Sequence, residues 1–168
     1  GFPTFSEAQM SLRAALRETH EEAGLKLAPE GLQALNCVAH WLTPPITAKR
    51  YDTYFWAASC EVTQEVIIDG HEISDFGWWS PSAALEAYAQ GEVDLAPPTF
   101  CLLTEMARHQ DPAQYILSAS SSPPPEAICP PLLRDPPQVS LCLPDDDAHP
   151  QSAHQTGTRH RLTRVDGR

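Results

Sequence analysis

Apolar side chains recur with a helical period near the start of the chain. Between Glu7 and Ala23 they are spaced by three or four residues, which places them on one face of a helix. Ala, Leu, Arg and Glu, which favour helices, fill most of the other positions. Ser6 is suited to cap the start, and Gly24 stands where a glycine can end a helix. The pattern therefore predicts one amphipathic helix over residues 7–23.

Shorter patterns predict the remaining elements. Strands are predicted at residues 51–59, which are rich in aromatic side chains, at residues 32–41, which are mostly apolar, and in shorter runs at residues 65–68, 76–79 and 139–143. Two more helices are expected, at residues 81–89, where Ser80 and Pro81 form a cap followed by a first-turn proline, and at residues 97–108.

The composition changes after residue 117. Residues 118–125 are rich in Ser and Pro and lack periodicity, which predicts a linker or an exposed loop. Residues 144–147 are expected to form a turn, and we expect the polar residues from 149 onward to be mobile. We therefore divide the chain into a domain at residues 1–117 and a C-terminal extension at residues 118–168 that contains one strand.

The chain of 168 residues is acidic, with a formal net charge of −11. This charge argues against generic nucleic-acid binding, which needs a surplus of Lys and Arg. A phosphorylated small molecule is still compatible with it, because carboxylates that hold a divalent cation present a positive face to such a ligand. We see no long apolar run, no signal peptide and no C-x-x-C pair among five dispersed cysteines. We therefore expect no membrane span, reduced thiols, and a cytoplasmic or other intracellular location, not secretion.

Three glutamates of the predicted helix carry the candidate chemistry. Glu18, Glu21 and Glu22 are spaced i, i+3 and i+4, so their carboxylates share one helix face. Three anions this close repel one another, and a hard divalent cation relieves the repulsion, because Mg²⁺ prefers oxygen ligands and shares them with substrate phosphates. Such a cation would orient a diphosphate and lower the pKa of an attacking water. The alternative is a solvated acidic face without a metal.

The residues around these glutamates carry a family resemblance. The run Arg17-Glu18-Thr19-His20-Glu21-Glu22-Ala23-Gly24-Leu25 reproduces the R-E-U-x-E-E-x-G-U half of the Nudix signature, in which U is apolar. The chain thus resembles the Nudix hydrolase superfamily, which implies an α/β (α+β) fold, an α/β/α sandwich around a mixed sheet. It also implies hydrolysis of nucleoside diphosphates linked to another moiety. By this resemblance Glu18, Glu21 and Glu22 bind the metal, Mg²⁺ or Mn²⁺, and Glu21 and Glu22 act in catalysis.

The first half of the signature is present in a stretched form. Gly1 and Glu7 satisfy its G-x5-E beginning, but the gap from Glu7 to Arg17 is two residues longer than the usual spacing. The resemblance implies that Arg17 is the structural arginine that pairs with a carboxylate of the signature, that Glu7 is the upstream glutamate, and that Gly24 is the closing glycine. Because the chain begins at the signature glycine, we expect a fold that is truncated and incomplete at its N-terminus.

A second set of motifs narrows the resemblance to one branch. The runs His40-Trp41-Leu42-Thr43-Pro44-Pro45 and Arg50-Tyr51-Asp52-Thr53-Tyr54-Phe55-Trp56 are similar to a W-x-T-P turn and an R-[FY]-D-T-x-F strand. Both motifs belong to a branch that includes acyl-coenzyme A diphosphatases. Residues 72–81, 95–99 and 143–146 are similar to later segments of the same branch. The resemblance therefore covers most of the chain and implies coenzyme A or an acyl-coenzyme A as the substrate.

Four residues outside the helix are further candidates for the site. Arg50 is suited to bind a substrate phosphate as a planar bidentate donor, and the alternative is an ion pair with Asp52 or a helix carboxylate. Trp41 and Tyr54 are candidates to stack on an adenine ring, although aromatic residues on strands are more often part of the core. Glu72 is a candidate for an additional metal ligand or a general base, and its alternative is a solvated loop charge.

The leading hypothesis is a Nudix-type diphosphatase. With Mg²⁺ or Mn²⁺ it would hydrolyse a diphosphate linkage in a small-molecule nucleoside diphosphate derivative such as coenzyme A. The alternative hypothesis is a catalytically inactive Nudix-like remnant that serves as a binding or interaction module. The stretched signature and the start at Gly1 favour this alternative, because an incomplete sheet would leave exposed edges and a poorly supported site. Neither hypothesis fixes the oligomeric state.

Overall fold

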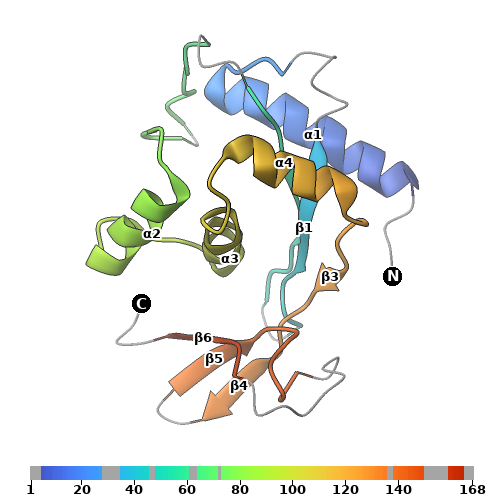
Figure 1. The fold of residues 1–168 in the computed structure, drawn as a ribbon, viewed down its shortest axis with the longest axis vertical. Helices are drawn as coiled ribbons and strands as arrows, with labels where there is room; N and C mark the ends of the chain where they lie inside the picture. The colour runs from blue at the N-terminus through green and yellow to red at the C-terminus, as the bar shows by residue number, and fades with distance from the viewer. Residues whose placement is uncertain are drawn as a thin grey trace. The chain divides into compact units, whose positions relative to one another are not determined.

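The structure is a computed structural model of the chain, and it describes residues 5–27, 35–45, 48–60, 64–71, 73–135, 138–149 and 159–164. In chain order the elements are α1 (Phe5–Ala23), β1 (Asn36–Leu42), β2 (Asp52–Ala57), α2 (Pro81–Gln90), α3 (Pro97–Met106), α4 (Pro112–Ser121), β3 (Ala127–Ile128), β4 (Leu132–Asp135), β5 (Gln138–Cys142) and β6 (Arg161–Arg164) (Figure 1). The chain divides into two compact units, the first made of residues 1–39 and 54–125 and the second of residues 40–53 and 126–168. The boundary expected after residue 117 falls inside α4.

The amphipathic helix predicted over residues 7–23 is confirmed as α1. It begins at Phe5, so Ser6 lies inside the helix and is not its N-cap. Gly24 ends the helix with a φ of 69°, a left-handed conformation that glycine adopts without steric cost. The N–H of Gly24 donates to the carbonyl of His20 at 3.0 Å. This hydrogen bond and the left-handed Gly24 thus end α1 immediately after the candidate glutamates in the sequence.

The starts predicted for α2 and α3 are confirmed. Ser80 caps α2, and its hydroxyl accepts a backbone N–H at 3.2 Å. Gly91 ends α2 in the left-handed conformation. α3 ends at Met106, two residues before its predicted end. Tyr88 of α2 and Phe100 of α3 pack with their ring centroids 5.5 Å apart, which holds the two helices together.

The linker predicted over residues 118–125 is wrong in its first half, because α4 extends to Ser121. Asp111 caps the helix, and its carboxylate accepts a backbone N–H at 2.8 Å. Tyr115, only 7% exposed, buries one side of α4. The hydroxyl of Ser121 donates to a carbonyl one turn back at 2.8 Å, so a serine-rich segment satisfies its polar side chains locally while remaining helical.

The strands predicted at residues 32–41 and 51–59 are confirmed as β1 and β2, with residues 32–34 outside the described part of the chain. A tight connection follows β1, because the N–H of Thr43 donates to the carbonyl of Tyr51 at 2.9 Å.

The described strands form two sheets. In one sheet the order is β2-β1-β3, and β1 pairs in parallel with β3 through His40 with Ala127 and Trp41 with Ile128. The other sheet, β4-β5-β6, is antiparallel. Helices combined with one partly parallel and one antiparallel sheet confirm the predicted α+β class.

The segment after residue 117 contains more strands than predicted. The strand expected at residues 139–143 is confirmed as β5. The expectation of a mobile polar tail is wrong for Arg161–Arg164, which form β6, whereas residues 150–158 lie outside the described part. β6 forms because it pairs with β5, and the hydroxyls of Ser140 and Thr163 lie 2.7 Å apart across that pair.

The strands predicted at residues 65–68 and 76–79 are wrong. Ile67 donates its N–H to the end of α1 instead of to a strand. The indole of Trp79 lies over Gly77, because a Cβ added at Gly77 would stand 2.6 Å from the indole nitrogen. Phe76, Trp78 and Trp79 are all more than half exposed, and residues 73–80 have irregular backbone.

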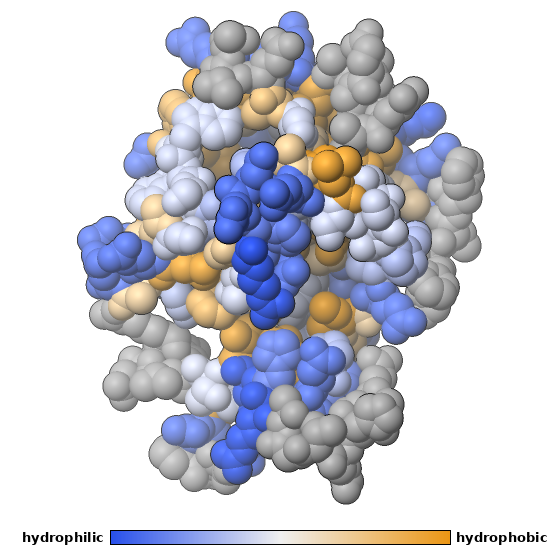
Figure 2. Space-filling model, viewed as in Figure 1, coloured by the Kyte–Doolittle hydropathy of each residue, from blue (hydrophilic) through white to orange (hydrophobic). Residues whose placement is uncertain are grey.

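Hydrophobic side chains reach the surface in separate places between hydrophilic ones (Figure 2). Those that are more than half exposed are Met10, Tyr51, Ile67, Phe76, Trp78, Trp79 and Leu117. The buried hydrophobic residues are Ala39, Ala87 and Tyr115 in the first unit and Trp41, Cys142 and Leu143 in the second. Among the helices described, none combines the length and the apolar composition needed to cross a membrane.

Candidate active site

The candidate site begins with the last turns of α1. Glu18, Glu21 and Glu22 occupy one face of this helix, as their spacing predicts. The side chains of Glu18 and Glu21 are 56% and 63% exposed, whereas Glu22 is half-buried. Two of the three carboxylates are therefore open to solvent and to a ligand, close to the point where Gly24 ends the helix.

Arg17 lies between two of these carboxylates. Its guanidinium is 3.7 Å from Glu18 and 3.6 Å from Glu21, and it is itself 63% exposed. The family resemblance predicts that Arg17 pairs with a carboxylate of the signature, and two of these carboxylates lie within 4 Å of it. The distances are longer than those of strong charge-assisted hydrogen bonds, and exposed pairs of this kind hold their geometry weakly. The Arg17 side chain is thus a loose counter-ion that a stronger cation can displace.

A metal site is not preassembled in the residues that the structure describes, since no group of three His, Cys, Asp or Glu side chains is arranged to hold an ion. The donor chemistry of Glu18, Glu21 and Glu22 nevertheless fits a hard divalent cation, because all their donors are carboxylate oxygens. Binding would require the exposed carboxylates to turn away from Arg17 and towards one point.

A second segment of the first unit lies against the end of α1. The N–H of Ile67 donates to the carbonyl of Ala23 at 2.9 Å, and the N–H of Asp69 donates to the carbonyl of Glu22 at 3.2 Å. The side chain of Gln64 makes two hydrogen bonds with the backbone of Lys26, at 2.8 and 3.0 Å. These bonds attach residues 64–69 to the end of the helix that carries the glutamates.

The attached segment also makes contacts with residues 71 and 73. The Asp69 carboxylate accepts the N–H groups of His71 at 3.1 Å and Ile73 at 3.0 Å, so it binds the residues on both sides of position 72. Glu72 itself lies outside the described residues. Sequence reasoning missed the anchoring role of Asp69, although the Asp69-Gly70 pair is a common turn signal.

Tyr54 lies in a different part of the first unit. It lines a cavity of about 680 Å³ together with Cys37 and Trp56 of the strands and with the end of α4. The only α1 residue that lines this cavity is Ala8, ten residues before Glu18 and therefore about 15 Å from it along the helix. The structure thus does not bring Tyr54 together with the glutamates.

Trp41 and Arg50 belong to the second unit. Trp41 is 6% exposed and is part of the core, which leaves its ring little surface for a ligand. The Nε–H of Arg50 donates to the carbonyl of Thr43 at 3.1 Å. The alternative ion pair between Arg50 and Asp52 is not formed, because Asp52 contacts His40 instead, with 2.6 Å between Oδ1 and Nε2.

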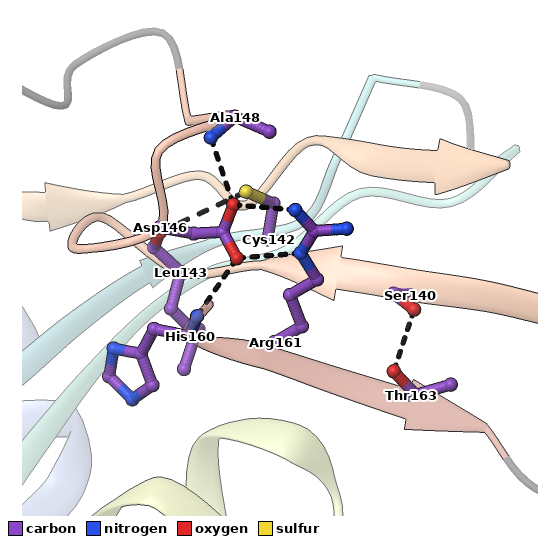
Figure 3. A network of polar contacts seen from close by, with 8 residues as sticks. All are labelled: Ser140, Cys142, Leu143, Asp146, Ala148, His160, Arg161 and Thr163. Carbon is purple, nitrogen blue, oxygen red and sulfur yellow. Dashed lines mark hydrogen bonds and ion pairs between the residues drawn. The ribbon is translucent and has the colours of Figure 1, made fainter. Parts of the chain in front are cut away.

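A buried polar network lies in the turn after β5, where the sequence indicated only a turn (Figure 3). Asp146 is fully buried, and both its oxygens contact the Arg161 guanidinium, at 2.6 and 3.1 Å. Its carboxylate also accepts the N–H groups of Ala148 at 2.9 Å and His160 at 2.8 Å. The hydrogen bond from Arg161 is the main reason why the pKa of Asp146 lies well below its ordinary value. Burial, followed by the neighbouring Asp146, raises the pKa of the Cys142 thiol to about 11. The network holds the turn and β6 in place.

A helix with a glutamate-lined face, ended by a left-handed glycine in an α+β chain, is the arrangement that the Nudix signature describes. Residues 25–108 match the family model of the NUDT19 Nudix domain, and the chain belongs to this family of Nudix domains. The matched segment includes Arg50, Tyr54 and Glu72. It begins one residue after Gly24, so Glu18, Glu21 and Glu22 lie outside it.

Three curated proteins called acyl-coenzyme A diphosphatase NUDT19 are similar to the chain. The chain is similar to the acyl-coenzyme A diphosphatase NUDT19 of Xenopus laevis, with 28% identity over 137 residues, which cover 77% of this chain and 36% of the relative. The protein of the same name from Homo sapiens is 33% identical over 87 residues, or 51% of this chain and 23% of the relative. The one from Gallus gallus is 39% identical over 72 residues, or 40% and 19%.

The chain therefore spans at most 36% of the length of these curated relatives. No solved structure matches the chain.

Proposed function

We propose that this chain is a metal-dependent hydrolase that cleaves the diphosphate linkage of coenzyme A or an acyl-coenzyme A. One observation carries the proposal: three glutamates share a face of α1, directly before the glycine that ends it, in a chain of the Nudix family. The names of its relatives support the choice of substrate, since each is called an acyl-coenzyme A diphosphatase.

In this proposal Glu18, Glu21 and Glu22 hold one Mg²⁺ or Mn²⁺ ion. When bound, the ion neutralises phosphate oxygens and lowers the pKa of a water molecule. Arg17 leaves the carboxylates as the ion binds and remains available to the substrate phosphates, for which a guanidinium is well suited.

Glu72 is proposed as the residue that takes a proton from the attacking water. The contacts of Asp69 support this proposal, because its N–H donates to the carbonyl of Glu22 while its carboxylate binds the neighbours of Glu72 on both sides. Water adds across the phosphoanhydride, so the reaction releases two phosphate monoesters and no other product.

The test is a hydrolysis assay with the purified chain, Mg²⁺ or Mn²⁺, and a panel of coenzyme A, acyl-coenzyme A, ADP-ribose and a nucleotide sugar. We expect release of adenosine bisphosphate from the first two compounds, and loss of activity by about a hundredfold or more in Glu21→Gln and Glu22→Gln. Glu92→Gln is the matched control, because Glu92 is an exposed glutamate in the turn after α2. Equal activity in all three variants would exclude the metal assignment.

A second candidate function is binding without hydrolysis. The contacts of Arg17 with Glu18 and Glu21 favour it, because in this arrangement an internal cation takes the place of the metal. A calorimetric titration with Mn²⁺ separates the two functions. Micromolar Mn²⁺ binding that Glu21→Gln abolishes supports the hydrolase, whereas coenzyme A binding without Mn²⁺ binding or turnover supports the binding module.

A further inference from the structure

A pocket in the first unit is lined by three aromatic side chains and one carboxylate. Its volume is about 510 Å³, and the described residues that line it are Asp75, Phe76, Gly77, Trp78, Trp79 and Val93. No Lys or Arg is among these lining residues. We propose that this pocket, which we call the aromatic pocket, binds the quaternary ammonium group of a small molecule. The proposal uses none of the residues assigned to the proposed hydrolysis.

The aromatic rings of the pocket are accessible to a ligand. Phe76, Trp78 and Trp79 are each more than half exposed, and contiguous exposed apolar side chains often mark a binding site. The face of an aromatic ring is electrostatically negative, so it attracts a cation that lies within about 6 Å of its centroid. Three such rings around one pocket therefore favour a positively charged occupant.

Gly77 allows the indole of Trp79 to lie close to the backbone of the pocket. A Cβ at position 77 would stand 2.6 Å from Nε1 and 3.3 Å from Cδ1 of this indole, so a larger residue would displace the ring. The residue after Trp79 is also held, because Ser80 caps α2 and its hydroxyl accepts a backbone N–H at 3.2 Å. The Trp79 ring is thus placed before a ligand binds, which lowers the entropy lost on binding.

Asp75 supplies the negative charge of the aromatic pocket. Its Oδ1 accepts the N–H of Phe76 at 2.8 Å, which fixes the carboxylate beside the first of the three rings. Its Oδ2 has no hydrogen-bond or ion-pair partner among the residues that the structure describes. This carboxylate can therefore attract a cation by charge, while the ring faces replace part of the water around it.

The combination of three rings with a single carboxylate selects the kind of cation. A primary ammonium group needs acceptors for three N–H groups, and a hard metal ion needs several oxygen ligands. Among the described side chains that line the pocket, only Asp75 offers a charged oxygen acceptor. A quaternary ammonium group has no N–H to satisfy and is the cation that cages of aromatic side chains recognise. The volume of about 510 Å³ also suits a small molecule.

The experiment is a titration of the full chain with choline, followed by the NMR signals of the N-methyl protons and of the tryptophan indole N–H groups. We expect saturable binding in which the N-methyl signal moves upfield, because the ring current shields protons that lie over a ring face. Neohexanol, in which carbon replaces the charged nitrogen of choline, should bind about tenfold more weakly. Trp79→Leu and Asp75→Asn should each weaken choline binding about threefold or more, because each removes an attraction for the cation.

Two matched controls keep the kind of substitution and change the place. Tyr51→Leu removes an exposed aromatic ring of the second unit, and Asp94→Asn removes an exposed carboxylate next to Val93 that does not line the pocket. Both controls should keep the affinity for choline within about twofold at physiological salt, because exposed charges outside the pocket are screened.

Gly77→Ala tests the positioning of the ring. It should weaken choline binding several-fold and shift the indole N–H signal that Trp79→Leu identifies by removing it.

The proposal is overturned if choline does not bind, if neohexanol binds as tightly as choline, or if Trp79→Leu and Tyr51→Leu have equal effects. Binding to phosphatidylcholine vesicles without binding to choline would overturn the choice of a small molecule. Since the assay contains no metal and no diphosphate, its result is independent of the hydrolysis test.

Discussion

Gly24 offers a sharp test of how the end of α1 is built. Its φ of 69° lies in the left-handed region, and a Cβ added there would stand 3.1 Å from the Cβ of Ile67 and 3.3 Å from its carbonyl oxygen. Gly70 is a natural control, because its φ is 71° but an added Cβ would meet nothing within 4 Å. Substitution by alanine at both positions therefore imposes the same backbone strain with and without crowding.

The expected magnitudes follow from these two geometries. Left-handed backbone costs an L-residue about 1–2 kcal/mol, and the stiffer unfolded chain of an alanine variant returns about 0.4–1 kcal/mol. Gly70→Ala should therefore lower the free energy of unfolding by about 1.6 kcal/mol or less. Crowding of a packed position adds about 1–3 kcal/mol, so Gly24→Ala should lower the free energy of unfolding by about 1–4.6 kcal/mol, always more than Gly70→Ala by about 1 kcal/mol or more.

Urea unfolding of both variants, followed by tryptophan fluorescence, measures the difference directly. Equal free-energy losses, within about 0.5 kcal/mol, would refute the close contact between Gly24 and residue 67. The attachment of residues 64–69 to the helix end would then have to be abandoned as well. A larger loss in Gly24→Ala accompanied by weaker Mn²⁺ binding would also connect this attachment to the glutamates.

Three other predictions concern α4 and the buried network. Asp111→Ala removes the cap that accepts a backbone N–H at 2.8 Å, and we expect a loss of about 0.5–2 kcal/mol of unfolding free energy in urea melts; no change would contradict the capping contact. The pKa of the Cys142 thiol is raised to about 11, so Cys142 should be the last cysteine that iodoacetamide labels at pH 8. Its labelling should accelerate as the pH rises towards 11, because the thiolate is the form that reacts. Rapid labelling of Cys142 at pH 8 would contradict its burial. Because the pKa of Asp146 is lowered in the folded chain, its charged carboxylate stabilises the fold above pH 3.8, the ordinary carboxyl pKa, and this stabilisation is lost as the pH falls below that value. The melting temperature of Asp146→Asn should therefore depend less steeply on pH in the acid range than that of the original chain. Equal slopes of melting temperature against pH would refute the assignment.

The elements that the sequence predicts well are those with local signals. α1 and α2 have apolar spacing and a glycine stop, and α2 also has a serine cap. β2 has a dense aromatic run, whereas β1 and β5 lie in short segments that are mostly apolar. The candidate glutamates were likewise found from one continuous motif, because helical spacing alone decides that they share a face.

The elements that it misses depend on partners far away in the chain. β6 exists because β5 pairs with it, and Asp146 is buried because Arg161, fifteen residues later, meets both its oxygens. α4 was hidden by a serine-rich composition, although its Asp111-Pro112 start was a usable signal. The role of Asp69 and the partner of Arg50 also depend on three-dimensional contacts that no pattern of spacing reports.

The parallel pair of β1 and β3 has a consequence for how the chain reaches this fold. His40 pairs with Ala127, so a segment of more than eighty residues must be closed before the two strands can meet. Contacts of such long range form slowly, after local helices have already appeared. Until β3 pairs with β1, the edge of β1 at His40 and Trp41 has unpaired backbone groups. During this interval the folding chain is most prone to form strand pairs with another molecule.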